Sequence, residues 1–310
     1  MSNSVGIIIL NYNTYDETVV CVRSIREKTT IPFHIYVVDN NSSDNSGKKL
    51  EKTYDSDNDV SVILNAVNSG YSAGNNVGIK EAVSNGHKYI AIVNSDVEIL
   101  NDAFKIMIET LKSDDDIMIV GPSVINNDKV ESQILRKRLT FKTFLLDRHP
   151  ICDILRRKEN EPDRYYSFSD VGVTKADGSV CGCCFCISAE DFRSIHYFDE
   201  NVFLYYEEDI IAYKMLEKQK LAAVNADAKI WHKENISTNK RGSAFVQFHR
   251  WTSVLYLLKK YAKVSKLKQT FIALWNILTW DMLSIGSIKY RNMNRDFRHK
   301  NWSIVRIDDK

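Results

Sequence analysis

The chain has 310 residues, of which 44% are apolar and 26% charged, which is ordinary for a globular protein and argues against a largely disordered one. No apolar run approaches the roughly 20 residues needed to cross a bilayer, and the N-terminus lacks a signal-peptide pattern. We therefore expect a cytoplasmic protein of one large domain, or of a domain with an appendage, whose six cysteines are reduced.

Charge is unevenly distributed along the chain, although the formal net charge is only +2. From Lys240 onward there are fifteen Lys and Arg residues and four Asp and Glu residues, so the chain before Lys240 is net acidic. The basic segment is compatible with a nucleic acid on charge alone, but no recognisable nucleic-acid-binding module accompanies it. We therefore expect no nucleic-acid partner.

Predicted strands and helices alternate through the first half of the chain. Each predicted strand is a continuous apolar run that ends in polar residues. The expected strands are 5–10, 35–38, 60–64 and 89–93, and the expected helices end near Lys28, Lys52, Ser84 and Leu111. Thr14 followed by Glu17 fits a capping box at the start of the first helix. This alternation implies an α/β fold, with a mostly parallel sheet flanked by helices on both faces.

The second half is less regular. Residues from about Asn126 to Ser179 show poor periodicity and a basic cluster at 136–138, as expected for an irregular insertion that closes over a site. Later elements are a strand at 180–187, an aromatic and acidic segment at 203–209 that enters a helix to about Lys218, a strand at 222–230, and helices from about Ala244 onward.

Polar residues end four of the predicted strands: Asn11 and Asn13, Asp39, Asn94 and Asp96, and His232. The carboxyl ends of parallel strands form one rim, and open α/β sheets bind their ligands there. Amides with a carboxylate suit a nucleobase and ribose, and we expect the small residues from Gly70 to Asn76 to form a loop that approaches the nucleoside closely. This loop has neither a GxGxxG pattern nor a Walker lysine, so a diphosphate would need a metal, which Asp96 and His232 are suited to hold.

Six motifs in this order resemble those of family 2 inverting glycosyltransferases with the GT-A fold. They are Ile8–Asn13, Val37–Asp44, Asn68–Asn76, Asn94–Asp96, Phe203–Asp209 and His232, and they cover roughly residues 5–240. The likeness is strongest to bacterial rhamnosyltransferase-like members that build surface polysaccharides. It implies a GT-A catalytic domain over 1–240, with a donor part in about 1–125 and an acceptor part in about 126–240, followed by a C-terminal helical extension over 241–310.

The resemblance also implies roles for single residues. Asp39 would read the base or ribose, Asp96 would ligate Mg2+ or Mn2+ on the diphosphate, and His232 would complete the metal shell. Asp209 matches the general base, with Glu208 beside it. The other expected nucleotide contacts are Asn11, Asn13, Asn41, Gly70, Asn75, Asn76, Asn94 and Ser95, and the expected acceptor-side residues are Tyr205, Tyr206 and Glu207.

Two positions depart from the family pattern. Asn94 stands where the family has the first carboxylate of its metal-binding motif, and Ile211 stands where many relatives have a second acid. The three acids at 207–209 also have a simpler interpretation, because acidic side chains favour a helix N-terminus. Three acids in a row exceed what capping needs, so we favour the catalytic interpretation, in which one carboxylate takes a proton from the acceptor hydroxyl.

The cysteine-rich segment Cys181–Cys186 invites a zinc hypothesis. If the segment lies in one strand, alternate sulfurs point to opposite faces, and a single metal ion does not easily collect all four. We expect a strand of small residues instead.

Apolar and aromatic residues recur at helical spacing in the C-terminal segment: Trp251, Leu255, Leu258 and Ala262, then Phe271, Leu274, Trp275, Leu278 and Trp280. Basic helices with Trp and Leu faces suit an anionic membrane surface, here the inner face of the plasma membrane. The alternative is a helical appendage that packs its aromatic residues on the catalytic domain, or on a second subunit of a homo-oligomer. We favour the membrane surface.

The sequence therefore predicts a metal-dependent inverting glycosyltransferase that moves a sugar from a UDP- or dTDP-linked donor to a growing surface polysaccharide or a lipid-linked glycan. A sugar-nucleotide nucleotidyltransferase is one alternative, but that class requires a Gly-rich loop with Arg or Lys after the first strand, and Asn11–Thr14 has neither. A nucleotide-sugar-binding subunit that has lost catalysis is the non-enzymatic alternative, suggested by Asn94 and Ile211.

Overall fold

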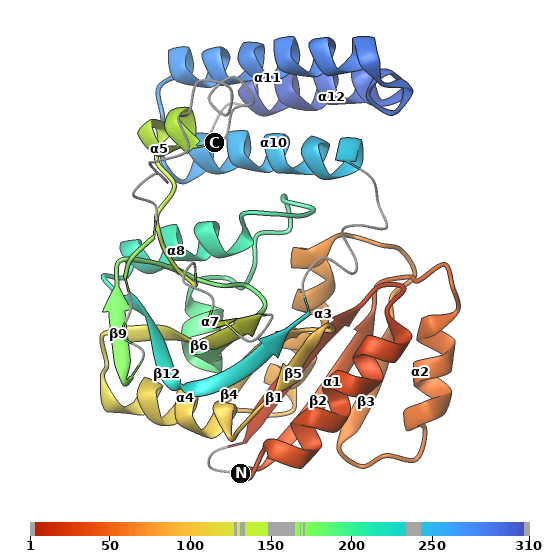
Figure 1. Cartoon of the computed structure of the whole chain (residues 1–310), viewed down its shortest axis with the longest axis vertical. Coiled ribbons are helices and arrows are strands. Elements are labelled where there is room, and N and C mark those ends of the chain that lie inside the picture. Colours follow the sequence, from red (N-terminus) through yellow and green to blue (C-terminus); the bar gives the residue numbers. More distant parts are fainter. Residues whose placement is uncertain are drawn as a thin grey trace.

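The computed structural model describes residues 4–126, 129–130, 134–147, 165–167, 169, 171–233 and 243–306. Its centre is a sheet whose main strands lie in the order β3–β2–β1–β4–β11–β6–β12–β5 (Figure 1). The first four are mutually parallel: β3 (Val60–Leu64), β2 (Phe33–Asp39), β1 (Val5–Asn11) and β4 (Tyr89–Asn94). The prediction of an α/β fold with a mostly parallel sheet is confirmed.

The second half of the sheet contains strands of both directions. Strand β11 (Cys184–Ser188) is antiparallel to β4 and to β6 (Ile117–Asn126), and β12 (Leu221–His232) is parallel to β6. Strand β5 (Val97–Ile99) follows β4 after only Ser95 and Asp96, and it pairs antiparallel with the end of β12. This pairing sets His232 opposite Val97, so the end of β12 lies beside the turn that follows β4.

Short strands extend this half of the molecule. Strand β7 (Lys129–Val130) pairs with β6, β9 (Val173–Ala176) pairs with β12, and β8 (Leu135–Lys137) pairs with β10 (Gly178–Val180) in a separate two-stranded sheet.

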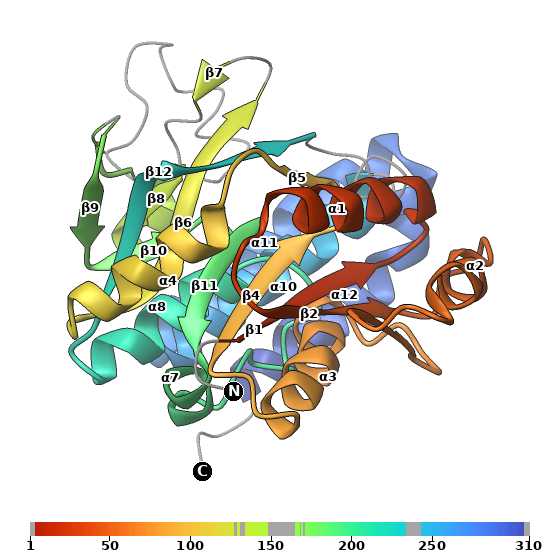
Figure 2. The same ribbon diagram turned by 90° about the horizontal axis from the view of Figure 1, so that it is seen from below.

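Helices cover both faces of the sheet, as Figure 1 and the view from below in Figure 2 show. Helices α1 (Tyr15–Lys28) and α4 (Ala103–Ser113) lie on one face, and α3 (Tyr71–Ser84) and α7 (Ala189–Ser194) lie on the other. Helix α2 (Ser46–Tyr54) contacts β3, and α8 (Glu207–Glu217) contacts β10 and β12. The apolar strands are buried on both sides, as parallel strands between two helical layers must be.

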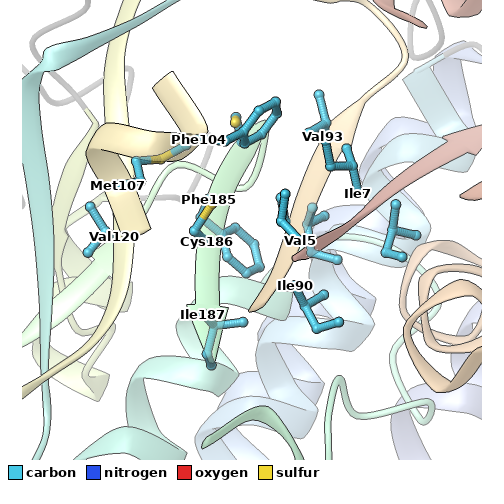
Figure 3. Close-up of a cluster of buried hydrophobic side chains, with 14 of the residues drawn as sticks. Val5, Ile7, Ile90, Val93, Phe104, Met107, Val120, Phe185, Cys186 and Ile187 are labelled. Carbon is cyan, nitrogen blue, oxygen red and sulfur yellow. The ribbon is translucent and has the colours of Figure 1, made fainter. Parts of the chain in front are cut away.

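The hydrophobic core lies on both sides of the central strands (Figure 3). Phe104 and Met107 of α4 are buried near Val120 of β6, and Val93 of β4 is buried close by. On the opposite face the ring of Phe185 meets that of Phe192 of α7 with centroids 6.5 Å apart. Because close-packed strands do not shift easily, the polar residue after each strand has a fixed position.

Two local predictions are wrong. Helix α1 begins at Tyr15, but Thr14 does not cap it with its side chain, because the hydroxyl instead lies within hydrogen-bond distance of Asn11 Oδ1 and Ser95 Oγ, each at 3.0 Å. The expected strand at 180–187 is interrupted by a turn at residues 182–183, so the cysteines of this segment lie on both sides of a turn and not in one strand. The five cysteines in the described ranges form no disulfide with one another.

Three long helices form the C-terminal part: α10 (Ser243–Lys260), α11 (Lys266–Gly286) and α12 (Ile288–Arg306). Figure 1 shows α10 between α8 and the outer layer of α11 and α12, with α5 (Phe141–Asp147) at one side. Leu255 and Leu258 of α10 are fully buried in one cluster with Tyr206 and Ile210, and Trp251 packs against α11 and α12. These α10 residues pack inside the protein, so the prediction that they face a membrane is wrong.

Asp199 fastens α10 to the rest of the chain. Its carboxylate accepts hydrogen bonds from the hydroxyls of Tyr256 at 2.8 Å and Tyr261 at 2.6 Å, and Lys260 Nζ lies 3.0 Å away. Burial alone would raise the pKa of Asp199, but these bonds and those from Asn201 hold it well below its ordinary value. Among the described helices, none is long and apolar enough to cross a bilayer.

Candidate active site

The end of β2 carries a carboxylate that is held from several sides. Asp39 is 5% exposed, and its Oδ1 accepts hydrogen bonds from Asn11 Nδ2 at 2.6 Å and from Ser42 Oγ at 2.5 Å. Its Oδ2 accepts from the backbone N–H of Ser42 at 3.0 Å. A Cβ atom at Gly47 would lie 2.4 Å from Asp39 Oδ2, so only glycine at 47 leaves room for the carboxylate. The orientation of Asp39 is therefore fixed.

Asn11 and Asn13 support this arrangement from the end of β1. Asn11 is fully buried, and its Oδ1 accepts hydrogen bonds from Thr14 and Thr18 while its Nδ2 donates to Asp39. Asn13 has φ +58° and its Oδ1 accepts from the backbone N–H of Ser43 at 2.8 Å. Both side chains thus shape the turns around Asp39. Asn41 is exposed at φ +58° in the same turn.

The segment Gly70–Asn76 differs from the expected loop, because α3 already begins at Tyr71. Gly70 has φ +90°, and a Cβ atom there would lie 2.3 Å from the carbonyl oxygen of Phe203, which accepts a hydrogen bond from Tyr71 N–H at 2.7 Å. The close approach that the structure shows is to the segment before α8, and the approach of the Gly70 backbone to a nucleoside stays a prediction. The sequence pattern of small residues is that of a helix packed tightly on a sheet.

Asn75 and Asn76 are buried residues of α3. Asn76 Nδ2 donates to the carbonyl of Phe198 at 3.0 Å, and its Oδ1 accepts from the Phe198 N–H at 3.2 Å. Asn75 Nδ2 donates to the carbonyl of Tyr71 at 3.0 Å. The described contacts of Asn76 therefore join α3 to the segment after α7, and a nucleotide contact of Asn75 or Asn76 stays a prediction.

The turn Asn94–Asp96 lies at the end of β4, in the middle of the sheet. The Tyr71 hydroxyl contacts both Asn94 Oδ1 at 3.1 Å and the carbonyl of Gly182 at 3.0 Å, so it ties this turn to the turn before β11. Ser95 Oγ accepts the hydrogen bond from Thr14. Tyr71 lies within the Asn68–Asn76 motif, but the contacts of its hydroxyl with these two turns became evident only from the structure.

Asp96 and His232 meet where β5 pairs with β12. His232 Nε2 lies 3.3 Å from Asp96 Oδ1, and the exposed fractions of the two side chains are 16% and 8%. The carbonyl of Asp96 also accepts a hydrogen bond from Lys233 N–H at 3.1 Å, which holds the two strand ends together. A carboxylate and an imidazole at this separation fit a divalent cation that takes its remaining ligands from a diphosphate and water. No group of three His, Cys, Asp or Glu residues suited to a metal occurs within the described ranges.

The three acids at the start of α8 point in different directions. Glu208 reaches the turn before β11, because a Cβ atom at Gly182 would lie 1.7 Å from Glu208 Oε1. Glu207 and Asp209 are 4% and 2% exposed, whereas Glu208 is half-buried. Burial raises the pKa of Glu208, and the positive charge of Arg136 offsets part of this rise. Burial, followed by the nearby charge of Glu208, raises the pKa of Glu207.

The contact between Glu208 and Gly182 connects the start of α8 to the turn Asn94–Asp96. The Tyr71 hydroxyl contacts both the carbonyl of Gly182 and the side chain of Asn94. Asp96 lies two residues after Asn94 in the same turn. The structure thus brings Glu208 and His232 to the carboxyl end of β4, beside Asn94 and Asp96, although the chain separates these three segments widely. Asp209, the base implied by position, contributes to the electrostatic surroundings of Arg136 and Tyr213.

The aromatic residues before α8 have structural contacts. Tyr205 and Tyr206 have φ +74° and +72°, and Tyr206 is buried in the cluster shared with α10. Phe203 stacks on His249 of α10 with ring centroids 4.4 Å apart. The segment therefore lies between Gly70 on one side and α10 on the other, which fixes the start of α8 and the direction of its acids.

Comparison with known proteins decides the family. The family model described as Glycosyl transferase family 2 matches residues 6–193, which is more than half of the chain. The chain belongs to glycosyl transferase family 2. It is 24% identical over 215 residues to a low-salt glycan biosynthesis hexosyltransferase of Haloferax volcanii, covering 69% of this chain and 62% of that protein. It is 27% identical over 161 residues to a glycosyltransferase of Streptococcus pneumoniae, covering 52% of each chain.

Two solved structures share the fold. A structure of GalNAc-T7 with UDP, GalNAc and Mn2+ superposes with a TM-score of 0.61 at 16% identity, covering 84% of this chain and 49% of that chain. A mannosyltransferase of Pyrobaculum calidifontis with GDP-Man and Mn2+ gives a TM-score of 0.55 at 14% identity, covering 97% and 85%. The fold is therefore GT-A, as the sequence motifs implied. The chain spans between half and two thirds of the length of the two curated relatives described above.

Proposed function

We propose that this family 2 protein is a metal-dependent inverting glycosyltransferase in which Glu208 is the general base. The observation that carries this proposal is the contact of Glu208 with Gly182, which directs one carboxylate to the sheet edge that holds Asn94 and Asp96. Asp209 is the other acid implied by position, but its side chain is almost fully buried. A base must reach the acceptor hydroxyl, and this requirement favours Glu208.

In the proposed reaction the Glu208 carboxylate takes the proton of the acceptor hydroxyl. The hydroxyl oxygen forms a bond to the anomeric carbon of the donor sugar, and the bond from that carbon to the nucleoside diphosphate breaks on the opposite side. The leaving diphosphate carries the electron pair away, so the configuration at the anomeric carbon inverts. The raised pKa of Glu208 suits this role, because a base works best when its pKa is near the working pH.

The donor would lie along the edge defined by Asp39 and Asp96. Asp39, fixed by Asn11, Ser42 and Gly47, would read the base or ribose. Asp96 and His232 would hold Mg2+ or Mn2+, and this choice is supported by the Mn2+ that accompanies the nucleotide in two solved structures with the same fold. When bound, the ion would offset the negative charge that develops on the diphosphate.

We further propose a hydroxyl of a surface polysaccharide or of a lipid-linked glycan as the acceptor. Support comes from the relatives, which are named for glycan biosynthesis in Haloferax volcanii and, at 23% identity over 163 residues, for poly(glycerol phosphate) polymerisation of teichoic acid in Staphylococcus epidermidis. Such an acceptor would place the protein at the inner face of the membrane. The donor is proposed to be a UDP- or dTDP-linked sugar, with rhamnose as one candidate.

A thermal-shift panel followed by a product assay tests the proposal. We expect one of the UDP-, dTDP- or GDP-linked sugars to raise the melting temperature of the wild type only in the presence of Mn2+ or Mg2+. The same donor should then be hydrolysed or transferred, with inversion at the anomeric carbon observed by proton NMR. Binding without turnover would favour the subunit that has lost catalysis, and release of pyrophosphate from a nucleoside triphosphate would favour the nucleotidyltransferase.

A further inference from the structure

One face of α11 is apolar and exposed in the part of the chain that the structure describes. Its exposed residues follow each other at intervals of four or three positions: Leu267, Phe271, Leu274, Leu278, Met282 and Ile285. Their exposed fractions range from 45% to 82%. At 1.5 Å per residue this stripe is about 27 Å long. Single exposed apolar residues are common on proteins, but a continuous stripe of this length marks a contact surface.

The opposite face of α11 anchors the helix firmly. Trp280 and Ile272 are buried between the C-terminal helices, and the Trp280 ring stacks on Phe297 of α12 with centroids 4.0 Å apart. Asn276 Nδ2 donates to Asn301 Oδ1 at 3.1 Å, which fixes the rotation of α11 against α12. The stripe is therefore exposed because the other face of the helix is already occupied.

The charge around the stripe selects its partner. Residues 243–306 contain twelve Lys and Arg residues and two Asp and Glu residues. Lys263, Lys266 and Lys268 are exposed at the start of α11, and Lys289 and Arg291 are exposed just beyond its end. Two copies of this chain would bring equal positive charge together along the stripe, whereas an anionic lipid surface would attract it.

We propose that this α11 face lies in the surface of an anionic lipid bilayer, with the stripe in the acyl boundary and the flanking cations among the headgroups. An apolar helix face bordered by Lys and Arg binds membranes in this orientation. The described part of the chain holds no helix able to cross the bilayer, so the contact is along the surface. This inference is independent of the sugar-transfer chemistry, because the stripe lies in the outer helical layer, separated from α8 by α10 (Figure 1).

The proposal also assigns a place to the active site. The acids at the start of α8 are separated from the outer layer by α10 (Figure 1), and Leu255 of α10 and Ile210 of α8 belong to one buried cluster. A protein held by α11 would keep α8 on the side of the molecule that is nearer to the lipid. An acceptor carried by a lipid would then lie on the same side of the molecule as α8. An acceptor dissolved in the cytoplasm would not be brought closer to α8 by the membrane contact.

Vesicle sedimentation with the full chain tests the proposal. The probes are vesicles of phosphatidylcholine alone and of phosphatidylcholine with phosphatidylglycerol. We expect the wild type to sediment with the anionic vesicles and the double variant Leu274→Glu/Leu278→Glu to bind them at least about tenfold more weakly. A second double variant, Lys289→Glu/Arg291→Glu, should also lose about tenfold or more. The matched control, Val67→Glu with Leu100→Glu, changes two exposed apolar residues of the catalytic part and should bind as the wild type does.

Melting temperature and donor hydrolysis of each variant separate loss of binding from loss of folding. All substituted residues are exposed, so both properties should remain close to those of the wild type. Equal binding of wild type and the Leu274→Glu/Leu278→Glu variant would overturn the proposal. So would a wild-type dimer in sedimentation velocity that this variant converts to a monomer, because the stripe would then be an interface between two copies. Failure of donor hydrolysis with intact vesicle binding would contradict the proposed function and leave this inference standing.

Discussion

The carboxylate of Glu208 occupies the space that a side chain at Gly182 would need, since a Cβ atom there would lie 1.7 Å from Glu208 Oε1. This contact joins the start of α8 to the turn before β11, and through the Tyr71 hydroxyl to Asn94. This contact is the reason that we propose Glu208, and not one of its acidic neighbours, as the base.

Gly182→Ala should displace the Glu208 carboxylate. We expect kcat/KM for donor turnover to fall by about hundredfold or more, the range typical of a lost general base, while the melting-temperature shift caused by the donor changes little. The control is Gly286→Ala, where a Cβ atom has no neighbour within 4 Å in the described structure. Equal activity of the Gly182→Ala variant and the wild type would contradict the assigned position of Glu208.

Arg136→Gln should alter the pH profile of turnover. The base is active when deprotonated, so kcat/KM falls as the pH decreases through the pKa of Glu208, which lies above the ordinary value of 4.5. Arg136 lowers that pKa, so its neutralisation should move the acidic limb to higher pH, and Arg136→Lys should restore most of the original profile. If the acidic limb of the pH profile were unchanged in Arg136→Gln, the group that titrates there would not be Glu208.

Gly47→Ala should weaken donor binding. The added Cβ atom would lie 2.4 Å from Asp39 Oδ2 and push the carboxylate out of its hydrogen bonds with Ser42. We expect the donor dissociation constant to rise about tenfold, which corresponds to one lost hydrogen bond to a charged group. Isothermal titration calorimetry with the donor that stabilises the wild type measures this dissociation constant. If the constant were the same in Gly47→Ala and in the wild type, Asp39 would not be part of the donor site.

Asp199→Asn should loosen α10 from the rest of the chain. The carboxylate accepts hydrogen bonds from two tyrosines and pairs with Lys260, so we expect the free energy of unfolding to fall by about 3 kcal/mol near neutral pH. Because the folded pKa of Asp199 is depressed, this contribution is complete above the ordinary value of 3.8 and is lost as the pH falls below it.

The matched control for this prediction is Glu200→Gln. Glu200 pairs with Lys80 in an exposed ion pair, which should contribute at most about 1 kcal/mol. Urea denaturation of both variants at two pH values measures the difference. If Asp199→Asn were no less stable than Glu200→Gln near neutral pH, the carboxylate would not be what fastens α10.

The polar rim was predictable because parallel strands share one carboxyl edge, so Asp39 and Asp96 had to lie on it. The need for glycine at positions 47 and 182 was not predictable. Gly47 makes room for the Asp39 carboxylate and Gly182 for the Glu208 carboxylate, and only the folded chain shows these approaches. In the C-terminal helices, too, the sequence pattern alone does not tell buried residues from exposed ones. Leu255 and Leu278 follow the same helical periodicity, but Leu255 is fully buried and Leu278 is 59% exposed, and only tertiary packing decides between them.

Comparison of Glu208→Gln with Asp209→Asn tests most directly which carboxylate is the general base. The measurement is the rate of donor hydrolysis at saturating donor and Mn2+, with the donor that stabilises the wild type. We predict that the rate of Glu208→Gln is at least about hundredfold lower than that of the wild type, although the variant still binds the donor. Asp209→Asn should keep most of its rate when it is assayed at a temperature at which it is as fully folded as the wild type. If Glu208→Gln were as fast as the wild type while a folded Asp209→Asn variant were inactive, the proposed role of Glu208 would be wrong and Asp209 would be the base.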